Sequence, residues 1–309
     1  MLIDEMKDKL VEMLDEARVM FDVPMAEWTS FKTGGEAECM VHPKTEDEII
    51  NIVKFAKENK IPYYIMGNGT NTLVRDGGIQ GIIIGLYQNF NAIDINEETA
   101  VVTVKAGALL SAVANLACRA GLSGIEFAGG IPGCIGGAVK MNAGAYDGEM
   151  KDIIQSVKIL HDDLSVKEYT AQEMGFDYRK SNVKENDIVL ETTIKLKKKE
   201  TSKIRARMVE LSKKRKEKQP LNMPSAGSAF KRPKGNYAGK LIQEAGLQGY
   251  TVGGAQVSKK HAGFVVNTGK ATANDVETIL KDIKEKVYEK HSVELEKEII
   301  IIGDDKKDN

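Results

Sequence analysis

The spacing of apolar and polar positions predicts a chain that contains both helices and strands. Residues 2–20 carry apolar side chains at helical spacing, which predicts an amphipathic helix. A second helix is predicted over residues 45–59, because it opens with the capping-box sequence Thr-Glu-Asp-Glu. A third is predicted over residues 109–120, followed by Gly121 at the usual position of a helix-ending glycine. Short strands are predicted at residues 62–66, 80–85, 101–105, 153–161 and 187–197.

The character of the sequence changes at Lys198. Residues 198–219 alternate charges of both signs, which predicts a helix with solvated faces that ends at Gln219-Pro220. The segments predicted after it are a Ser/Gly loop, a helix over 238–245, two strands, a helix over 273–290, a strand over Glu298–Ile302 and a solvated tail. We therefore expect an α+β protein with two lobes.

Composition narrows the class of protein. The chain has 309 residues and a formal net charge of −1, so it lacks the broad basic field of nucleic-acid-binding proteins. Its three cysteines form no C-x-x-C pair and its four histidines form no i, i+4 pair, so we expect no metal site. The N-terminus is acidic rather than basic, and no apolar run approaches the roughly 18 residues of a membrane span. We expect a cytoplasmic protein without membrane insertion.

Residues 127–150 are rich in glycine and alanine, with isoleucine, valine and methionine interleaved. Because glycine lacks a Cβ, such a main chain can approach another surface closely. A flexible linker would be polar and would lack these apolar anchors. The segment predicts a main-chain wall against a large flat or polyanionic ligand, although glycines also mark bulges and tight packing.

A second glycine cluster follows a strand-like run and reads Gly67-Asn68-Gly69-Thr70-Asn71. A turn of this kind exposes successive main-chain N–H groups, which suits an anion such as a pyrophosphate. The motif is neither a P-loop nor the fingerprint of the Rossmann fold, since it lacks their later lysine or glycine. Alone it is also compatible with an ordinary hairpin turn. Together with residues 127–150, it indicates a dinucleotide held by loops.

The two clusters read GNGTNTLVRDGGIQGIII (67–84) and GGIPGCIGGAVKMNAGAYDGE (129–149), and both resemble the UDP-N-acetylenolpyruvoylglucosamine reductase family. Further segments resemble this family in the same order: TSFKTGGEAE (29–38), YRKS (178–181), PSAGSAFKRP (224–233), AGKLIQEAGLQGYTVGGAQVSKKHAGFVVN (238–267) and LEKEIIIIG (295–303). The family turn usually has serine where this chain has Thr70, so a hydroxyl is kept. The resemblance covers nearly all of the chain after residue 28.

The resemblance implies a two-lobed FAD-binding domain of the PCMH/vanillyl-alcohol-oxidase type and a C-terminal α+β substrate-binding domain. The implied limits are residues 1–28 for an N-terminal helix, 29–199 for the FAD-binding domain with its two subdomains, and 200–309 for the substrate-binding domain. FAD would be bound non-covalently, with NADPH as co-substrate. The residues that would hold FAD are Gly67, Asn68, Gly69, Thr70, Asn71, Gly130, Ile131, Pro132, Gly133, Gly136, Gly137, Ala138, Asn142 and Gly144.

Three residues are candidates for catalysis. From the sequence alone, Arg179 is typical of a surface ion pair, Ser228 of a turn, and Glu298 of an exposed strand position. The resemblance implies instead that the arginine lies beside the enolpyruvyl carboxylate, the serine donates a proton and the glutamate assists protonation. The residues expected to contact substrate are Tyr178, Lys231 and Lys260.

The expected activity is NADPH-dependent reduction of UDP-N-acetylglucosamine enolpyruvate to UDP-N-acetylmuramate, in the synthesis of peptidoglycan precursors. Two alternatives stay open: another FAD oxidoreductase of the same superfamily, and a non-catalytic flavin-binding regulator. One subtype of the family has a tyrosine-bearing loop, but this chain has no tyrosine between Ser181 and Gln219 and resembles the shorter subtype. We expect a monomer.

Overall fold

The computed structural model describes residues 2–306 and contains two compact units, each built from separate stretches of the chain. Unit 1 takes the chain up to Met20, then Met40–Asn68 and Ile82–Arg215, while unit 2 takes Phe21–Cys39, Gly69–Gly81 and the chain from Lys216. The domain limits predicted at residues 28 and 199 describe continuous stretches and stay a prediction.

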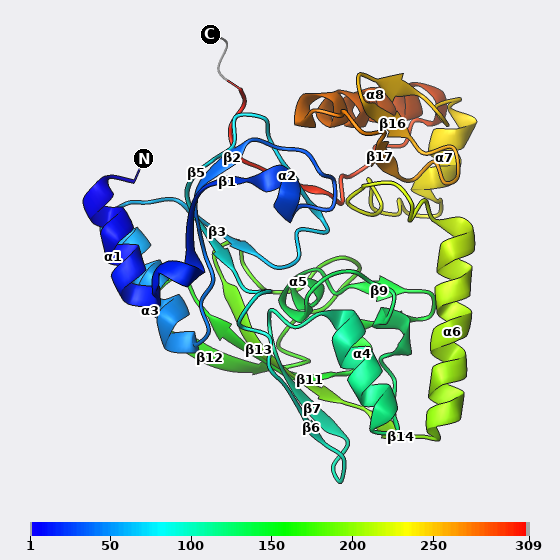
Figure 1. Ribbon diagram of the computed structural model, residues 1–309. Coiled ribbons are helices and arrows are strands. Elements are labelled where there is room, and N and C mark those ends of the chain that lie inside the picture. Colours follow the sequence, from blue (N-terminus) through cyan, green and yellow to red (C-terminus); the bar gives the residue numbers. More distant parts are fainter. Residues whose placement is uncertain (1, 307–309) are drawn as a thin grey trace. The chain divides into compact units, whose positions relative to one another are not determined.

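Unit 1 is centred on a five-stranded antiparallel sheet in the order β12-β11-β13-β7-β6 (Figure 1). Its strands are β6 (Ile93–Asn96), β7 (Val101–Lys105), β11 (Ile154–Leu160), β12 (Val166–Thr170) and β13 (Ile188–Lys195). The short helix α5 (Ile135–Lys140) packs against β7 and β13 and buries Ile135, Ala138 and Val139. The glycine-rich segment is thus attached to the central sheet through the packing of α5 on β7 and β13.

The remaining elements of unit 1 are mostly helical. They are α1 (Asp4–Leu14), α3 (Glu46–Glu58), α4 (Leu110–Arg119), α6 (Thr201–Lys218, whose last three residues belong to unit 2), the 3-10 turns Glu16–Arg18, Glu126–Ala128 and Met150–Asp152, and the short strands β3 (Tyr63–Met66), β8 (Leu122–Ser123), β9 (Gly144–Ala145), β10 (Gly148–Glu149) and β14 (Lys197–Lys198). β3 runs parallel to the second half of β5, from Tyr63 opposite Ile82 to Met66 opposite Gly85.

The helix predicted over residues 2–20 is wrong beyond Leu14. Asp15 has a φ of 84°, which no right-handed helix accommodates, and Val19 already belongs to a strand. The helix predicted from Thr45 is confirmed, since the Thr45 hydroxyl accepts a hydrogen bond from the N–H of Glu48. The Glu48 carboxylate also accepts a 2.6 Å hydrogen bond from the N–H of Lys44.

Unit 2 is built around α8 (Ala273–His291), α7 (Ala238–Glu244) and the three-stranded sheet β15-β16-β17 (Figure 1). The strands are β15 (Thr251–Val252), β16 (Ala255–Val257) and β17 (Val265–Asn267), where only two had been predicted. A parallel pair joins β4 (Thr72–Val74) to β18 (Ile300–Ile302), so the last strand begins two residues later than predicted. Unit 2 also contains α2 (Met25–Trp28).

Three strands contain the boundaries between the units: β1 (Val19–Pro24), β2 (Glu36–Val41) and β5 (Ile79–Gly85). They belong to a four-stranded sheet in the order β1-β2-β5-β3. No helix within residues 2–306 is long and apolar enough to cross a membrane. In the same part of the chain, no group of three His, Cys, Asp or Glu side chains is placed to hold a metal ion.

Candidate functional site

In unit 1, the two predicted cofactor segments lie beside each other. The side-chain amide of Asn68 donates a 2.9 Å hydrogen bond to the main-chain oxygen of Pro132. A Cβ placed on Gly67 would lie 3.2 Å from the Cβ of Cys134, so the turn and the glycine-rich segment are nearly in contact there. The structure therefore brings residues 67–68 and 132–134 together, as the sequence predicts for a shared ligand.

The main chain around α5 is fixed against the end of β7. The N–H groups of Ile135 and Gly136 donate to the carbonyl oxygens of Ala108 and Ala106, and a Cβ on Gly136 would lie 2.9 Å from that of Ala106. Only glycine fits at Gly136 without a shift. Gly137 is exposed, and outside its own helix no atom of the described chain lies within 4 Å of the Cβ position.

These two glycines provide a test of whether the residues present fit FAD. The main chain at Gly136 packs directly against Ala106, whereas the main chain at Gly137 faces open space. A large planar or phosphate-bearing ligand needs this kind of approach to the main chain. The neighbouring predicted residues share the same supported segment, since Gly133 accepts from the N–H of Leu110 and Ile131 donates to Ala128. The arrangement fits a bound dinucleotide.

The predicted cofactor residue Asn142 is fully buried and its side chain is engaged inside the protein. Its amide nitrogen donates to Glu149 Oε2 and to the main-chain oxygen of Asp177, both at 3.0 Å. Its Oδ1 accepts from the N–H of Lys151 at 2.9 Å. With a φ of 42°, Asn142 also turns the chain sharply after α5. The side chain therefore ties the glycine-rich segment to the loop that carries Arg179.

Arg179 sits at a tight turn in which Asp177 and Lys180 form an antiparallel bridge. Its φ of 53° is left-handed, a conformation that costs a non-glycine residue roughly 1–2 kcal/mol. Its Nη2 donates a 3.1 Å hydrogen bond to the main-chain oxygen of Gly144, another predicted cofactor residue. The exposed ring of Tyr178 lies under the guanidinium, 5.1 Å from its central carbon. The turn thus presents an aromatic ring and a guanidinium beside the glycine-rich segment.

In unit 2, the second half of the predicted FAD turn is held by two different contacts. Gly69 is buried with a φ of 60°, and its carbonyl oxygen accepts from the N–H of Ser30 at 3.1 Å. The Ser30 hydroxyl also donates to the main-chain oxygen of Ser225 at 2.6 Å. Asn71 donates through its side chain to the main-chain oxygen of Glu298 at 3.0 Å. Thr70 lies between these contacts and is half-buried.

Ser228 and Glu298 lie on adjacent, antiparallel segments of unit 2. The N–H of Glu298 donates to the oxygen of Ala229 at 3.0 Å, and Phe230 forms a bridge with Lys297. Ser228 is exposed directly after Gly227, whose φ is 78°, whereas Ala229 is fully buried. The structure therefore brings these two predicted catalytic residues onto neighbouring segments, and Ser228 is exposed there.

The two predicted substrate lysines of unit 2 have partners within that unit. Lys231 is half-buried and its ammonium pairs with the Glu296 carboxylate at 2.5 Å. Lys260 is exposed, and its ammonium donates to the main-chain oxygen of Lys216 at 2.6 Å. Lys231 is thus attached to the same pair of segments as Ser228 and Glu298, while Lys260 fastens the end of α6.

The sequence pattern did not single out Arg215, which lines a cavity of about 480 Å³ in unit 1 together with Gly130 and Tyr146. Its Cδ lies 3.2 Å from the Cβ position of Gly130. Burial lowers the pKa of the guanidinium, and within residues 2–306 it has no hydrogen-bond or ion-pair partner. The helical spacing of the sequence could have identified Arg215, because it lies on the same face of α6 as Ile204, Met208 and Leu211.

Cys134 lies within the glycine-rich segment but has the environment of an inert thiol. It is buried, and burial raises the pKa of the thiol to about 11. The raised pKa disfavours the thiolate near neutral pH, which is the environment of a structural cysteine. Cys39 and Cys118 are buried free thiols as well.

Comparisons with known proteins show the family to which the chain belongs. Residues 37–168 match the model of an FAD-binding domain, which places the chain among the flavoproteins. Residues 219–302 match the C-terminal domain of UDP-N-acetylenolpyruvoylglucosamine reductase. The chain is 48% identical to the reductase of that name from Caldanaerobacter subterraneus subsp. tengcongensis, over 96% of this chain and 98% of that protein. It belongs to the UDP-N-acetylenolpyruvoylglucosamine reductase family.

Other relatives support the family and the fold. The reductase from Clostridioides difficile is 46% identical over 96% of this chain and 97% of that protein. The crystal structure of the Thermus caldophilus reductase has a TM-score of 0.79 and 38% identity, and it covers 91% of this chain and 98% of that one. An alkyldihydroxyacetonephosphate synthase, at 13% identity and a TM-score of 0.51 over 64% of this chain and 41% of that one, shares the fold alone. The α+β fold class and the FAD-binding domain are confirmed.

Proposed function

We propose that this protein reduces the enolpyruvyl group of UDP-N-acetylglucosamine enolpyruvate to a lactyl ether, giving UDP-N-acetylmuramate for peptidoglycan synthesis. NADPH serves as the reductant and FAD as the cofactor. The observation that carries the proposal is the pairing of the segments of Ser228 and Glu298, within the region that matches the family's C-terminal domain. A non-catalytic flavoprotein would have no need of this pair.

When bound and reduced by NADPH, FAD would supply a hydride for the terminal carbon of the enol ether. Negative charge then grows on the carboxylate that is conjugated to the double bond. A guanidinium fixed before the reaction stabilises this charge more in the transition state than in the ground state. We assign that role to Arg179, because its turn and its bond to Gly144 hold it at the edge of the glycine-rich segment.

The carbon next to the carboxylate then needs a proton. Ser228 supports this role because its hydroxyl is exposed on a segment whose next residue is fully buried. A serine hydroxyl is a weak acid, so it must be assisted. We assign the assistance to Glu298, whose main chain is bonded to both Ala229 and Asn71. Lys231, paired with Glu296, and Tyr178, beneath Arg179, are proposed to contact the substrate.

The proposed FAD contacts come from main chain rather than from side chains at most positions. Bare main chain at Gly137, the turn at Gly67 and the segment around Gly133 suit a dinucleotide. The side chains of Asn68, Asn71 and Asn142 support the proposed site indirectly, since each is bonded to a main-chain oxygen. Arg215 is proposed to meet an anionic group of a bound ligand, which would offset the cost of its burial.

The direct test is anaerobic NADPH oxidation by FAD-loaded protein, with and without UDP-N-acetylglucosamine enolpyruvate. The proposal expects substrate-dependent oxidation and formation of UDP-N-acetylmuramate, identified by mass spectrometry. Reduction of bound FAD without turnover of this substrate would reject the assigned reaction.

A variant separates the two half-reactions. We expect Ser228→Ala to leave flavin reduction by NADPH intact and to slow substrate reduction by about 10²–10⁴-fold, the usual loss for a general acid. Ser225→Ala, in the same loop, is the matched control and should change neither rate. Equal losses in both half-reactions would refute the role given to Ser228.

We also propose where the protein is located and in which oligomeric state it exists. Buried free thiols and the absence of a membrane-spanning helix within residues 2–306 support a cytoplasmic protein. A monomer is proposed, which size-exclusion chromatography with light scattering would test.

A further inference from the structure

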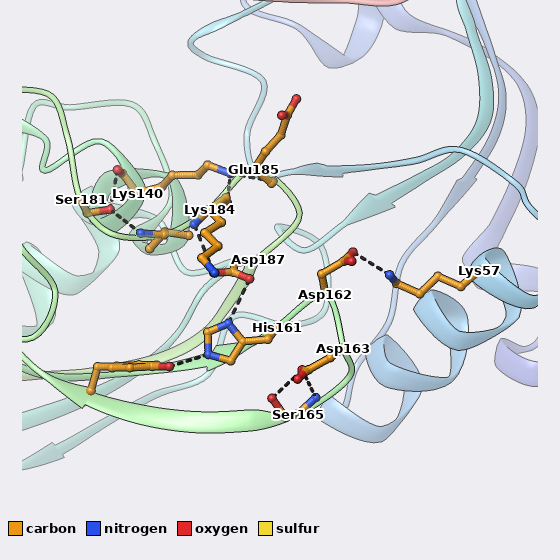
Figure 2. Close-up of polar contacts among 12 residues, drawn as sticks. Lys57, Lys140, His161, Asp162, Asp163, Ser165, Ser181, Lys184, Glu185 and Asp187 are labelled. Carbon is orange, nitrogen blue, oxygen red and sulfur yellow. Dashed lines mark hydrogen bonds and ion pairs between the residues drawn. The ribbon is translucent and has the colours of Figure 1, made fainter.

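Lys140, the last residue of α5, has a side chain that the reaction does not directly require. Its half-buried ammonium donates to the main-chain oxygens of Lys184 and Glu185, at 2.9 Å each. Its own carbonyl oxygen accepts a 2.7 Å hydrogen bond from the hydroxyl of Ser181. Figure 2 shows both connections, which join the end of α5 to two points of one loop.

That loop begins directly after the turn of Arg179. The turn is held on its N-terminal side by Asn142, which donates to the oxygen of Asp177. On its C-terminal side it is held by Ser181, which donates to Lys140. All of these fastenings lie within residues 140–144, as does the Gly144 oxygen that accepts from the guanidinium. Residues 140–144 therefore hold the turn of Arg179 through three hydrogen bonds.

The far side of the loop is anchored to the central sheet. Asp187 is buried and accepts from the N–H of Lys184 at 3.1 Å. The other carboxylate oxygen of Asp187 lies 3.0 Å from Nδ1 of His161 (Figure 2). Nε2 of His161 lies 2.7 Å from the hydroxyl of Tyr169. Asp187 thus links Lys184 to the central sheet, so a contact from Lys140 connects this loop to α5.

We propose that Lys140 is a positioning residue that sets the guanidinium of Arg179 for its substrate. The inference rests on the role given to Arg179 in the proposed function. Without the ammonium, the carbonyl oxygens of Lys184 and Glu185 lose their donor, and the loop is free to shift relative to α5. Burial lowers the pKa of Lys140, in keeping with an ammonium enclosed by main chain. A displacement of about 1 Å at a reacting group can cost roughly 10²-fold in rate.

The test is a double-mutant cycle of Lys140→Met and Arg179→Lys, measured on pre-reduced, FAD-loaded enzyme mixed with the enolpyruvyl substrate. Lys140→Met is expected to slow substrate reduction about tenfold or more, with flavin reduction by NADPH unchanged. In the Arg179→Lys background it should cause no further loss, because its effect passes through Arg179. Lys140→Arg, which keeps a cationic donor, should restore most of the rate.

The matched control is Lys184→Met, because only the main chain of that exposed lysine takes part. It should leave both half-reactions unchanged. Additive losses in the double variant, or no loss in Lys140→Met, would overturn the positioning role. Normal substrate reduction by Arg179→Lys would instead reject the proposed function. If Lys140→Met does not fold, Lys140→Gln, which keeps a shorter donor, completes the same cycle.

Discussion

The side-chain amide of Asn71 donates a hydrogen bond to the main-chain oxygen of Glu298, with 3.0 Å between nitrogen and oxygen. The main-chain oxygen of Asn71 also accepts from the N–H of Ile300. The turn proposed to bind FAD and the segment proposed to assist protonation are therefore bound together on both sides of Ile299. A change at this asparagine should affect cofactor and substrate chemistry together.

Asn71→Ala tests this connection. Removing a part-buried amide donor costs about 1 kcal/mol, so the unfolding free energy should fall by that amount. We expect a larger effect on function, with weaker FAD binding and slower substrate reduction than in Thr72→Ala, the neighbouring control. Flavin fluorescence titration and single-turnover kinetics measure the two effects. If Asn71→Ala loses only FAD affinity, and substrate reduction is unchanged in the FAD-saturated enzyme, then Asn71 does not position Glu298 for the reaction.

Two glycines form a contrasting pair. A Cβ on Gly69 would lie 2.2 Å from the oxygen of Trp28, and the φ of Gly69 is left-handed, so Gly69→Ala should lose at least about 2 kcal/mol of stability.

Gly137→Ala places its Cβ in open space and should stabilise the apoprotein by about 0.4–1 kcal/mol. It should nevertheless weaken FAD binding, since the methyl group occupies the proposed cofactor surface. Urea unfolding of apoprotein and FAD titration measure both; unchanged FAD affinity in Gly137→Ala would exclude that surface.

Arg215→Met should separate stability from ligand binding. Because the guanidinium is half-buried and has no partner within residues 2–306, its removal should leave the melting temperature of the apoprotein unchanged or higher. Affinity for FAD or for the UDP-linked substrate should fall by about 10- to 100-fold, as for a lost charged hydrogen bond. Arg205→Met, at an exposed position of the same cavity, is the control. Unchanged affinity for both ligands would show that no anion meets Arg215.

His42 should make unfolding sensitive to mild acid. The residue is buried, and burial lowers the pKa of its imidazole below the ordinary 6.5. The unfolded chain then binds a proton that the folded chain does not, so this contribution to stability is present above pH 6.5 and is lost as the pH falls. The loss is at most about 1.4 kcal/mol per pH unit.

The test for His42 is urea unfolding between about pH 7.5 and pH 5.5. His42→Asn, which keeps a donor toward the Gly85 oxygen, should flatten the pH dependence relative to the original protein. His261, whose pKa is also lowered by burial, should maintain part of the slope. An unchanged slope in His42→Asn would show that its imidazole does not titrate on unfolding.

Helix ends that are marked by a capping residue within one turn could be predicted from the sequence. Thr45 and Gly121 mark the start of α3 and the end of α4 through contacts made within one turn, and both predictions are confirmed. The end of α1 could not be predicted, because the helical pattern continues while Asp15 leaves the helix and β1 joins a sheet. There the pairing with distant strands decides the local conformation.

The candidate site divides in the same way. The two glycine clusters could be recognised from their composition, and the structure brings Asn68 and Pro132 together as predicted. The support of Arg179 could not be predicted, since its partners Asn142 and Gly144 are remote in sequence and act through a buried amide and a carbonyl oxygen. Such contacts leave no periodic pattern.

The core of unit 2 combines residues from distant parts of the chain. Phe31 and Leu73 are fully buried in one cluster with Ile242, Val265 and Ile299. During synthesis, Phe31 and Leu73 emerge from the ribosome long before their partners. Their apolar side chains therefore stay exposed until the last third of the chain has been made. This unit can complete its core only after Ile299 has been synthesised, so protection of the nascent chain by chaperones should matter more than for a protein whose domains are contiguous.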